Sequence, residues 1–175
     1  MRALLAAVLI PALLVCGARA QDEEEPVKVE RYLVHLTLGD ALEDIQRVFP
    51  PASEWPITAE PRTKVKRYRI ERAATKYPAP HTDIMWLGLK HGGLVEIQLI
   101  YTAAYTRTKS VDSLARDLAL TYGEPHSNGS KFWWSDGRTV LRVFYAEVPG
   151  KDGGVELRTS LQLLEAKLFP KNESE

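Results

Sequence analysis

The sequence has 175 residues, 45% of them hydrophobic, and equal numbers of basic and acidic residues, so its formal net charge is zero. A near-neutral chain has no overall electrostatic attraction to nucleic acid, which argues against a nucleic-acid-binding function. Its single cysteine excludes an intrachain disulfide, and a chain of this length buries enough surface to fold as one domain without such a bond.

The first twenty residues predict a secretory signal peptide. Arg2 provides a positive start, residues 3–15 form an apolar run too short to span a bilayer, and an Ala-Arg-Ala motif ending at Ala20 fits a cleavage site. Cleavage removes Cys16, and an exported domain without disulfides fits a bacterial periplasm better than an animal extracellular space. The alternative is a lipoprotein that carries its lipid on Cys16, but Val15 stands where such signals have a small residue.

The rest of the chain divides into three parts. Residues 21–27 form an acidic segment that we expect to be a linker. Residues 28–169 are expected to form a single domain, and residues 170–175 a disordered tail. No transmembrane segment is expected once the signal peptide is removed.

In the first half of the domain, alternating apolar residues predict a strand over 32–38. A short helix is expected next, capped by Asp40 and ended by Pro50-Pro51. A proline-rich connector over 51–61 precedes a basic strand. A hairpin is expected over 84–101, with its turn at a Gly-Gly pair.

In the second half, Ser110 is expected to cap a second helix that ends at Gly123. A hairpin follows over 132–146, because a Ser-Asp-Gly-Arg turn separates two apolar runs. Strict alternation of apolar and polar residues then predicts a last strand over 155–163.

These elements suggest a degenerate internal repeat, with one copy at about 38–101 and a second at about 110–165. In each copy a helix stopped by proline precedes an aromatic strand, a glycine turn and a strand that ends in tyrosine. The expected fold class is therefore α+β, an antiparallel sheet with two helices packed on one face and built from two helix-hairpin repeats. The opposite face is expected to be partly solvated.

Two short motifs carry a family resemblance. The run Leu38-Gly39-Asp40-Ala41-Leu42-Glu43-Asp44-Ile45 resembles the helix entry of BamE-like and beta-lactamase-inhibitor-like exported domains, and Tyr122-Gly123-Glu124-Pro125 resembles their helix exit. The likeness extends from about Leu38 to Leu163. It implies a small, exported, non-catalytic module that binds other proteins through a sheet face or loops, and it assigns no functional residue.

The sequence offers little for catalysis or metal binding. The four histidines lack the spacing of a metal site, and His81 beside Asp83 is more typical of a surface hydrogen-bonded pair. Serine-hydrolase and phosphate-loop motifs are absent. We therefore expect no catalytic residue, no metal and no cofactor. An enzyme with an unrecognised site, gathering His81, Asp83 or His35, remains the alternative, together with a lipid or small-ligand carrier.

Two features favour binding instead. Arg67 and Arg69 share one face of the basic strand and can pair with phosphate or carboxylate groups. The alternative interpretation of these charges is an edge strand protected against aggregation, and the pattern favours it because Glu60 and Glu71 dilute the basic patch. Trp133 and Trp134 must point to opposite faces of their strand. If Trp134 packs beneath the helices, Trp133 lies on the open face as an anchor for a partner, unless the connector or Trp55 covers it.

The sequence thus predicts a periplasmic binding module that recognises an envelope protein or an anionic lipid or glycan. Arg67 and Arg69 are expected to supply charge complementarity, and Trp133 apolar contact area.

Overall fold

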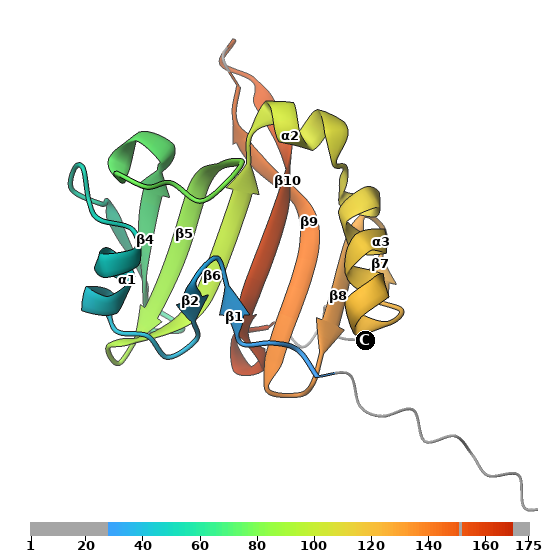
Figure 1. Ribbon diagram of the computed structural model, residues 1–175, viewed down its shortest axis with the longest axis horizontal. Helices are drawn as coiled ribbons and strands as arrows, with labels where there is room; N and C mark the ends of the chain where they lie inside the picture. Colours follow the sequence, from blue (N-terminus) through green and yellow to red (C-terminus); the bar gives the residue numbers. More distant parts are fainter. Residues whose placement is uncertain (1–27, 151, 170–175) are drawn as a thin grey trace, which may run out of the picture.

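The computed structural model describes residues 28–150 and 152–169 (Figure 1). The predicted signal peptide, Cys16, the acidic linker and the predicted tail lie outside the described residues. The first elements in chain order are β1 (Tyr32–Leu33), β2 (Leu36–Thr37), α1 (Leu42–Val48), β3 (Ile57–Glu60), β4 (Val65–Glu71), the 3₁₀ turn η1 (Arg72–Ala74), β5 (Thr82–Lys90) and β6 (Gly93–Tyr101). The remaining elements are α2 (Ala103–Thr108), α3 (Val111–Tyr122), β7 (His126–Asn128), β8 (Lys131–Ser135), β9 (Thr139–Pro149), β10 (Val155–Glu165) and the 3₁₀ turn η2 (Ala166–Leu168).

Eight of the strands form one antiparallel sheet with the order β3-β4-β5-β6-β10-β9-β8-β7. Two consecutive four-stranded meanders, β3 to β6 and β7 to β10, meet where β6 pairs with β10. In that pairing Leu161 lies opposite Leu99 and Leu163 opposite Ile97, so both meanders contribute apolar side chains to one face at the junction.

The expected fold class is wrong. The described chain is dominated by the eight-stranded sheet and has three α-helices, instead of two helices packed on a sheet made of two helix-hairpin repeats. The proposed repeat matched the β5–β6 hairpin with β8–β9, but sheet position makes β9–β10 the counterpart of β5–β6. A glycine turn between an aromatic arm and an apolar arm is common to many hairpins, so it does not identify equivalent strands.

The main core lies between one face of the sheet and the elements that cover it. Figure 1 shows α1 and α3 at the two sides of the sheet and the short β1–β2 hairpin between them. Ile45 of α1, Leu36 of β2 and Leu114 of α3 are buried in the same cluster as Leu87 and Leu163 of the sheet. One apolar cluster therefore spans both meanders.

The predicted strand over 32–38 is wrong. The segment forms β1 and β2 around a tight turn at Val34 and His35, which have φ of 46° and 67°. Left-handed φ is rare for a valine, so alternation alone gives no warning of the turn. The predicted cap of α1 also differs: Ala41 is the N-cap, while the Asp40 carboxylate accepts a hydrogen bond from the Thr37 N–H at 2.7 Å.

The other predicted elements are confirmed, with three additions. The short helix ends just before Pro50-Pro51, the basic strand and both hairpins form, and the final strand is β10. Ser110 caps α3 by accepting a hydrogen bond from the Ser113 N–H. The sequence did not predict β3, β7 or α2.

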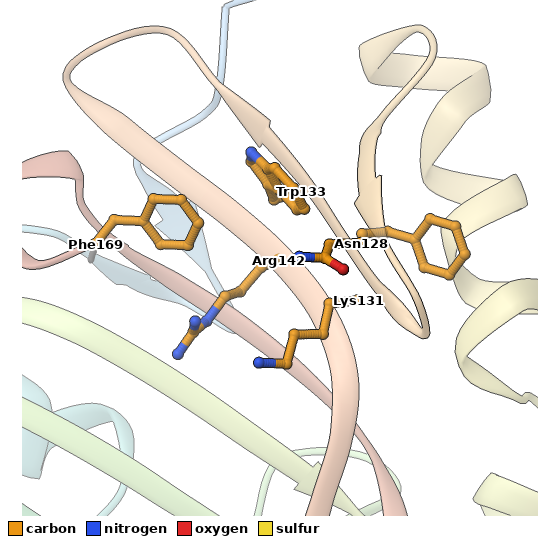
Figure 2. Close-up of a pocket in the computed structure, with 6 residues that line it drawn as sticks. Asn128, Lys131, Trp133, Arg142 and Phe169 are labelled. Carbon is orange, nitrogen blue, oxygen red and sulfur yellow. The ribbon is translucent and has the colours of Figure 1, made fainter. Parts of the chain in front are cut away.

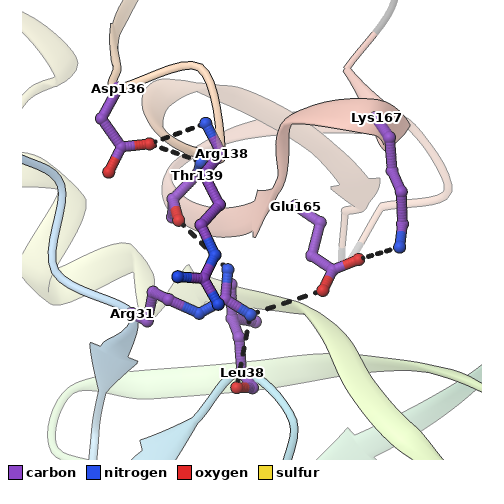
Figure 3. Close-up of polar contacts among 7 residues, drawn as sticks. All are labelled: Arg31, Leu38, Asp136, Arg138, Thr139, Glu165 and Lys167. Carbon is purple, nitrogen blue, oxygen red and sulfur yellow. Dashed lines mark hydrogen bonds and ion pairs between the residues drawn. The ribbon is translucent and has the colours of Figure 1, made fainter.

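A polar cluster holds the start of the described chain against the sheet (Figure 3). The Arg31 guanidinium donates to Thr139 Oγ1 at 3.3 Å and to the Leu38 carbonyl at 3.4 Å, and it lies 3.4 Å from Glu165 Oε1. Partial burial raises the pKa of Glu165, but ion pairs with Lys167 and Arg31 outweigh it, so the pKa is lowered overall. The cluster ties residues near the start of the domain to the end of β10.

Asp136, in the turn between β8 and β9, also connects the start of the described chain to the sheet. Its Oδ1 accepts from the Thr139 N–H at 2.6 Å and the Arg138 N–H at 2.9 Å, and its Oδ2 accepts from the Val29 N–H at 3.3 Å. Desolvation raises the pKa of Asp136, but the backbone hydrogen bonds lower it by a larger amount, so the pKa is lowered overall.

Among the described residues, no helix is long and apolar enough to cross a membrane.

Candidate functional site

The sheet surface that points away from α1, α2 and α3 is the candidate site, and we call it the open face. Its two apolar clusters contain no residue of these helices. One cluster centres on Ile84, Ile100 and Val148, and the other on Trp133 and Leu164. Of the described elements, η2 with the following Phe169 packs on the second cluster, at the β8 and β9 side.

A row of large polar and aromatic side chains crosses the open face. Six residues on neighbouring strands lie opposite one another in the sheet register, each paired with the next. We call them the central row: Arg69, Trp86, Gln98, Gln162, Arg142 and Trp133. The row contains two guanidinium groups, two amides and two indoles, and no carboxylate. Trp86, Gln98 and Arg142 are half-buried, so part of each side chain contacts solvent.

Hydrogen bonds hold the amides of the central row in place. Gln98 Nε2 donates to Ser160 Oγ at 3.1 Å. Arg142 Nε donates to Gln162 Oε1, and the Arg142 guanidinium lies 4.7 Å from the centre of the Phe144 ring. These contacts restrict the rotamers of the Gln98, Gln162 and Arg142 side chains.

A buried carboxylate stands beside the row. Glu96 is 2% exposed, and it accepts hydrogen bonds from Arg67 Nε at 2.8 Å and from Gln162 Nε2 at 2.5 Å. Gly88 lies between Arg67 and Glu96 in the sheet register. A Cβ on Gly88 would come within 2.8 Å of Glu96 Oε2. The absence of a side chain at Gly88 therefore leaves room for Arg67 and Glu96 to form their ion pair across β5.

Arg67 and Arg69 lie on the open face, and both have carboxylate partners. Arg67 pairs with Glu96 and also lies 3.4 Å from Glu60, while Arg69 pairs with Glu71. Since β4 lies between β3 and β5, the alternative interpretation of these charges as protection of an edge strand is wrong. Their role in recognition stays a prediction.

Trp133 is not the exposed anchor that the sequence suggested. It lies on the opposite side of the strand from Trp134, but it is only 7% exposed. The Phe169 ring centre is 6.0 Å away and the His126 ring stacks at 5.7 Å, so η2 and β7 supply the cover. Trp55 instead packs in the main core.

Beside Trp133 the open face has a small hollow of about 100 Å³ (Figure 2). It is lined by Asn128, Lys131, Phe132, Trp133, Arg142 and Phe169. Sequence reasoning missed Arg142 here, and it also missed Trp86, Gln98 and Gln162 as site residues. The alternation along β6 and β10 already placed the two glutamines opposite the core, and that was the available signal.

The residues proposed for a catalytic alternative do not meet. His81 stacks on Tyr105 with ring centres 4.9 Å apart, whereas Asp83 faces Arg158 at 3.8 Å. His35 shares a hydrogen bond with the Tyr32 hydroxyl. Within the described ranges, no three His, Cys, Asp or Glu side chains are grouped to hold a metal ion.

No protein-family model, curated protein or solved structure matches this chain. The resemblance to BamE-like and beta-lactamase-inhibitor-like domains therefore stays a prediction.

Proposed function

We propose that this protein is an exported, non-catalytic binding module that holds a second envelope protein on its open face. The observation that supports this most directly is the central row, in which the half-buried side chains of Arg69, Trp86, Gln98 and Arg142 stand in register on the open face, while Gln162 and Trp133 are buried in the same row. Tryptophan and arginine are the residues most enriched at the energetic centres of protein interfaces.

The dimensions of the open face favour a protein over a small ligand. Six strands at the usual spacing make the central row about 24 Å wide, which suits a contact of about 800 Å² per partner. The hollow beside Trp133, at about 100 Å³, is smaller than the pockets of several hundred Å³ that hold small molecules.

The chemistry of the row favours an acidic partner surface. Guanidinium groups stand near its two ends, at Arg69 and Arg142, and the amides of Gln98 and Gln162 lie between them. A carboxylate on a partner would meet the positive charge of these two half-buried guanidinium groups, while Gln162 is buried and donates to Glu96. The carboxylates nearby, Glu96 and Glu71, are engaged by arginines of the same face.

Photo-crosslinking in the native host tests this proposal. A photoreactive residue replaces Gln98 at the centre of the row, and in the control it replaces Leu120, which is 90% exposed on α3. We expect one protein adduct from position 98, and its loss when Arg142→Glu is added. The purified pair should then bind at least tenfold more weakly with Arg142→Glu, which corresponds to about 1.4 kcal/mol. The same adduct from position 120, or unchanged affinity, contradicts the proposal.

Export has its own test. Mass spectrometry of the protein recovered from the envelope should show a mature chain that starts at Gln21. A chain that starts at a lipid-modified Cys16 would support the lipoprotein alternative, and a full-length chain in the cytoplasm would contradict export.

A further inference from the structure

The basic segment has a second side that the proposed function does not use. Along β4 the side chains alternate, so Lys66 and Tyr68 point away from Arg67 and Arg69, toward α1. Lys66, Tyr68 and Lys64 line a pocket of about 370 Å³ between α1, β4 and the β5–β6 turn. The other lining residues are Leu42, Glu43, Leu89, His91 and Gly92.

Two turns bring the basic groups of this pocket together. Lys66 pairs with Leu89 in the β4–β5 register, and continuing that register by two residues places Lys64 opposite His91. Lys64 and His91 have φ of 57° and 52°, a left-handed conformation that favours glycine or asparagine. Non-glycine residues in this conformation cluster at functional sites.

The cations on the two sides of β4 differ in their partners. Arg67 and Arg69 are matched by carboxylates, whereas neither Lys64 nor Lys66 forms an ion pair in the described part of the chain. Glu43 is the one carboxylate among the residues that line the pocket. The lining therefore carries a net positive charge that the described residues do not neutralise.

The pocket also has a volume and a floor suited to a ligand. Its volume lies within the usual range for small-molecule sites. Leu89, which is 6% exposed, provides an apolar base, and the phenol of Tyr68 adds a hydroxyl donor beside the lysines. Lysine ammonium groups bind phosphate as point charges.

From this geometry we propose that the pocket of Lys64, Lys66 and His91 binds a phosphate group. This site lies on the opposite side of β4 from the open face and is independent of the protein partner proposed there. The phosphate group can belong to a soluble phosphate compound or to a lipid headgroup. A soluble phosphate monoester and the phosphomonoester of phosphatidic acid present the same anionic oxygens to the two lysines and the imidazole.

NMR titration of the purified full chain tests the site, with inorganic pyrophosphate as the soluble probe. Amide shifts should change at Lys64, Lys66, His91 and Gly92, and affinity should fall as salt is added. Lys64→Gln with Lys66→Gln should weaken binding at least tenfold. The charge-matched control, Lys28→Gln with Lys76→Gln, removes two exposed lysines outside the pocket and should retain the affinity.

Glu43→Gln provides the opposite test, because it removes the only carboxylate of the lining and should tighten pyrophosphate binding. Equal affinity in the wild type and in the Lys64, Lys66 variant, or equal loss in the control variant, would overturn the proposal. Loss of this site leaves crosslinking at position 98 unchanged, so the two proposals fail separately.

A second arm identifies the source of the phosphate. The protein is floated with phosphatidylcholine vesicles that either contain or lack phosphatidic acid, and the bound fractions are compared. Flotation with phosphatidic acid that depends on Lys64 and Lys66 assigns a lipid headgroup. Pyrophosphate binding without such flotation assigns a soluble ligand. Absence of both contradicts the site.

Discussion

Gly88 is the residue on which the ion pair between Arg67 and the buried Glu96 depends. In a Gly88→Ala variant the new Cβ would lie 2.8 Å from Glu96 Oε2 and 2.9 Å from Val65 Cγ1. We expect a loss of about 1–3 kcal/mol in the free energy of unfolding, measured with urea. Gly154→Ala is the matched control, since its Cβ would meet no atom within 4 Å. Equal stability of the two variants would show that Arg67 and Glu96 do not need this space.

Asp136 makes stability depend on pH. Its folded-state pKa is lowered, so its contribution is present above the unfolded pKa of about 3.9 and is lost as pH falls through the folded pKa. Asp136→Asn should therefore be less stable than the wild type at pH 7, and the difference should shrink below about pH 4. Urea unfolding at a series of pH values measures this difference. A difference that stays constant down to pH 2 would contradict the role of the carboxylate.

At the scale of elements, the capping of α3 can be tested directly. Ser110 Oγ accepts from the Ser113 N–H at 3.2 Å, so Ser110→Ala should cost about 1 kcal/mol of unfolding free energy. Ser113→Ala is the control, because alanine favours the helix interior and should leave stability unchanged or slightly raised. Chemical denaturation measures the free energy of unfolding of both variants. A loss of stability in Ser113→Ala but not in Ser110→Ala would contradict the cap.

The elements that sequence predicted are those with one side in the core. β6 and β10 alternate cleanly because one face meets the helices. β3 and β7 are the edge strands, and their residues are exposed or nearly so, so no alternation marks them. The fold class failed because pairing between distant strands, such as β6 with β10, leaves no local signal in the sequence.

The site was predicted only in part for a related reason. Arg67 and Arg69 were placed on the correct face by alternation, since that depends on neighbours in one strand. The carboxylate partners of Arg67, Glu60 and Glu96, come from other strands, and Phe169, which covers Trp133, follows β10. Contacts between segments that are distant in the sequence therefore determine the partners of Arg67 and the burial of Trp133.

On the scale of the whole molecule, the shared core predicts one cooperative transition. Trp55, which lies just before β3, and Trp134 of β8 are far apart in the sequence but belong to the same buried cluster. In each of two single-tryptophan variants, with the other three tryptophans replaced by phenylalanine, fluorescence and far-UV circular dichroism should give the same urea midpoint. Two separate midpoints would mean that the meanders unfold independently.

The place of β10 in the sheet affects how the chain reaches its native state. β10, the last strand in the described part of the chain, lies in the middle of the sheet between β6 and β9 and pairs with residues about sixty positions earlier in the sequence. Until residue 165 is available, the two meanders have no strand to join them, so an incomplete chain leaves the edge of β6 open to proteases and to other unfinished chains. Pairing strands so far apart in the sequence is slow, so the sheet is completed late and the β6 edge stays exposed during that interval.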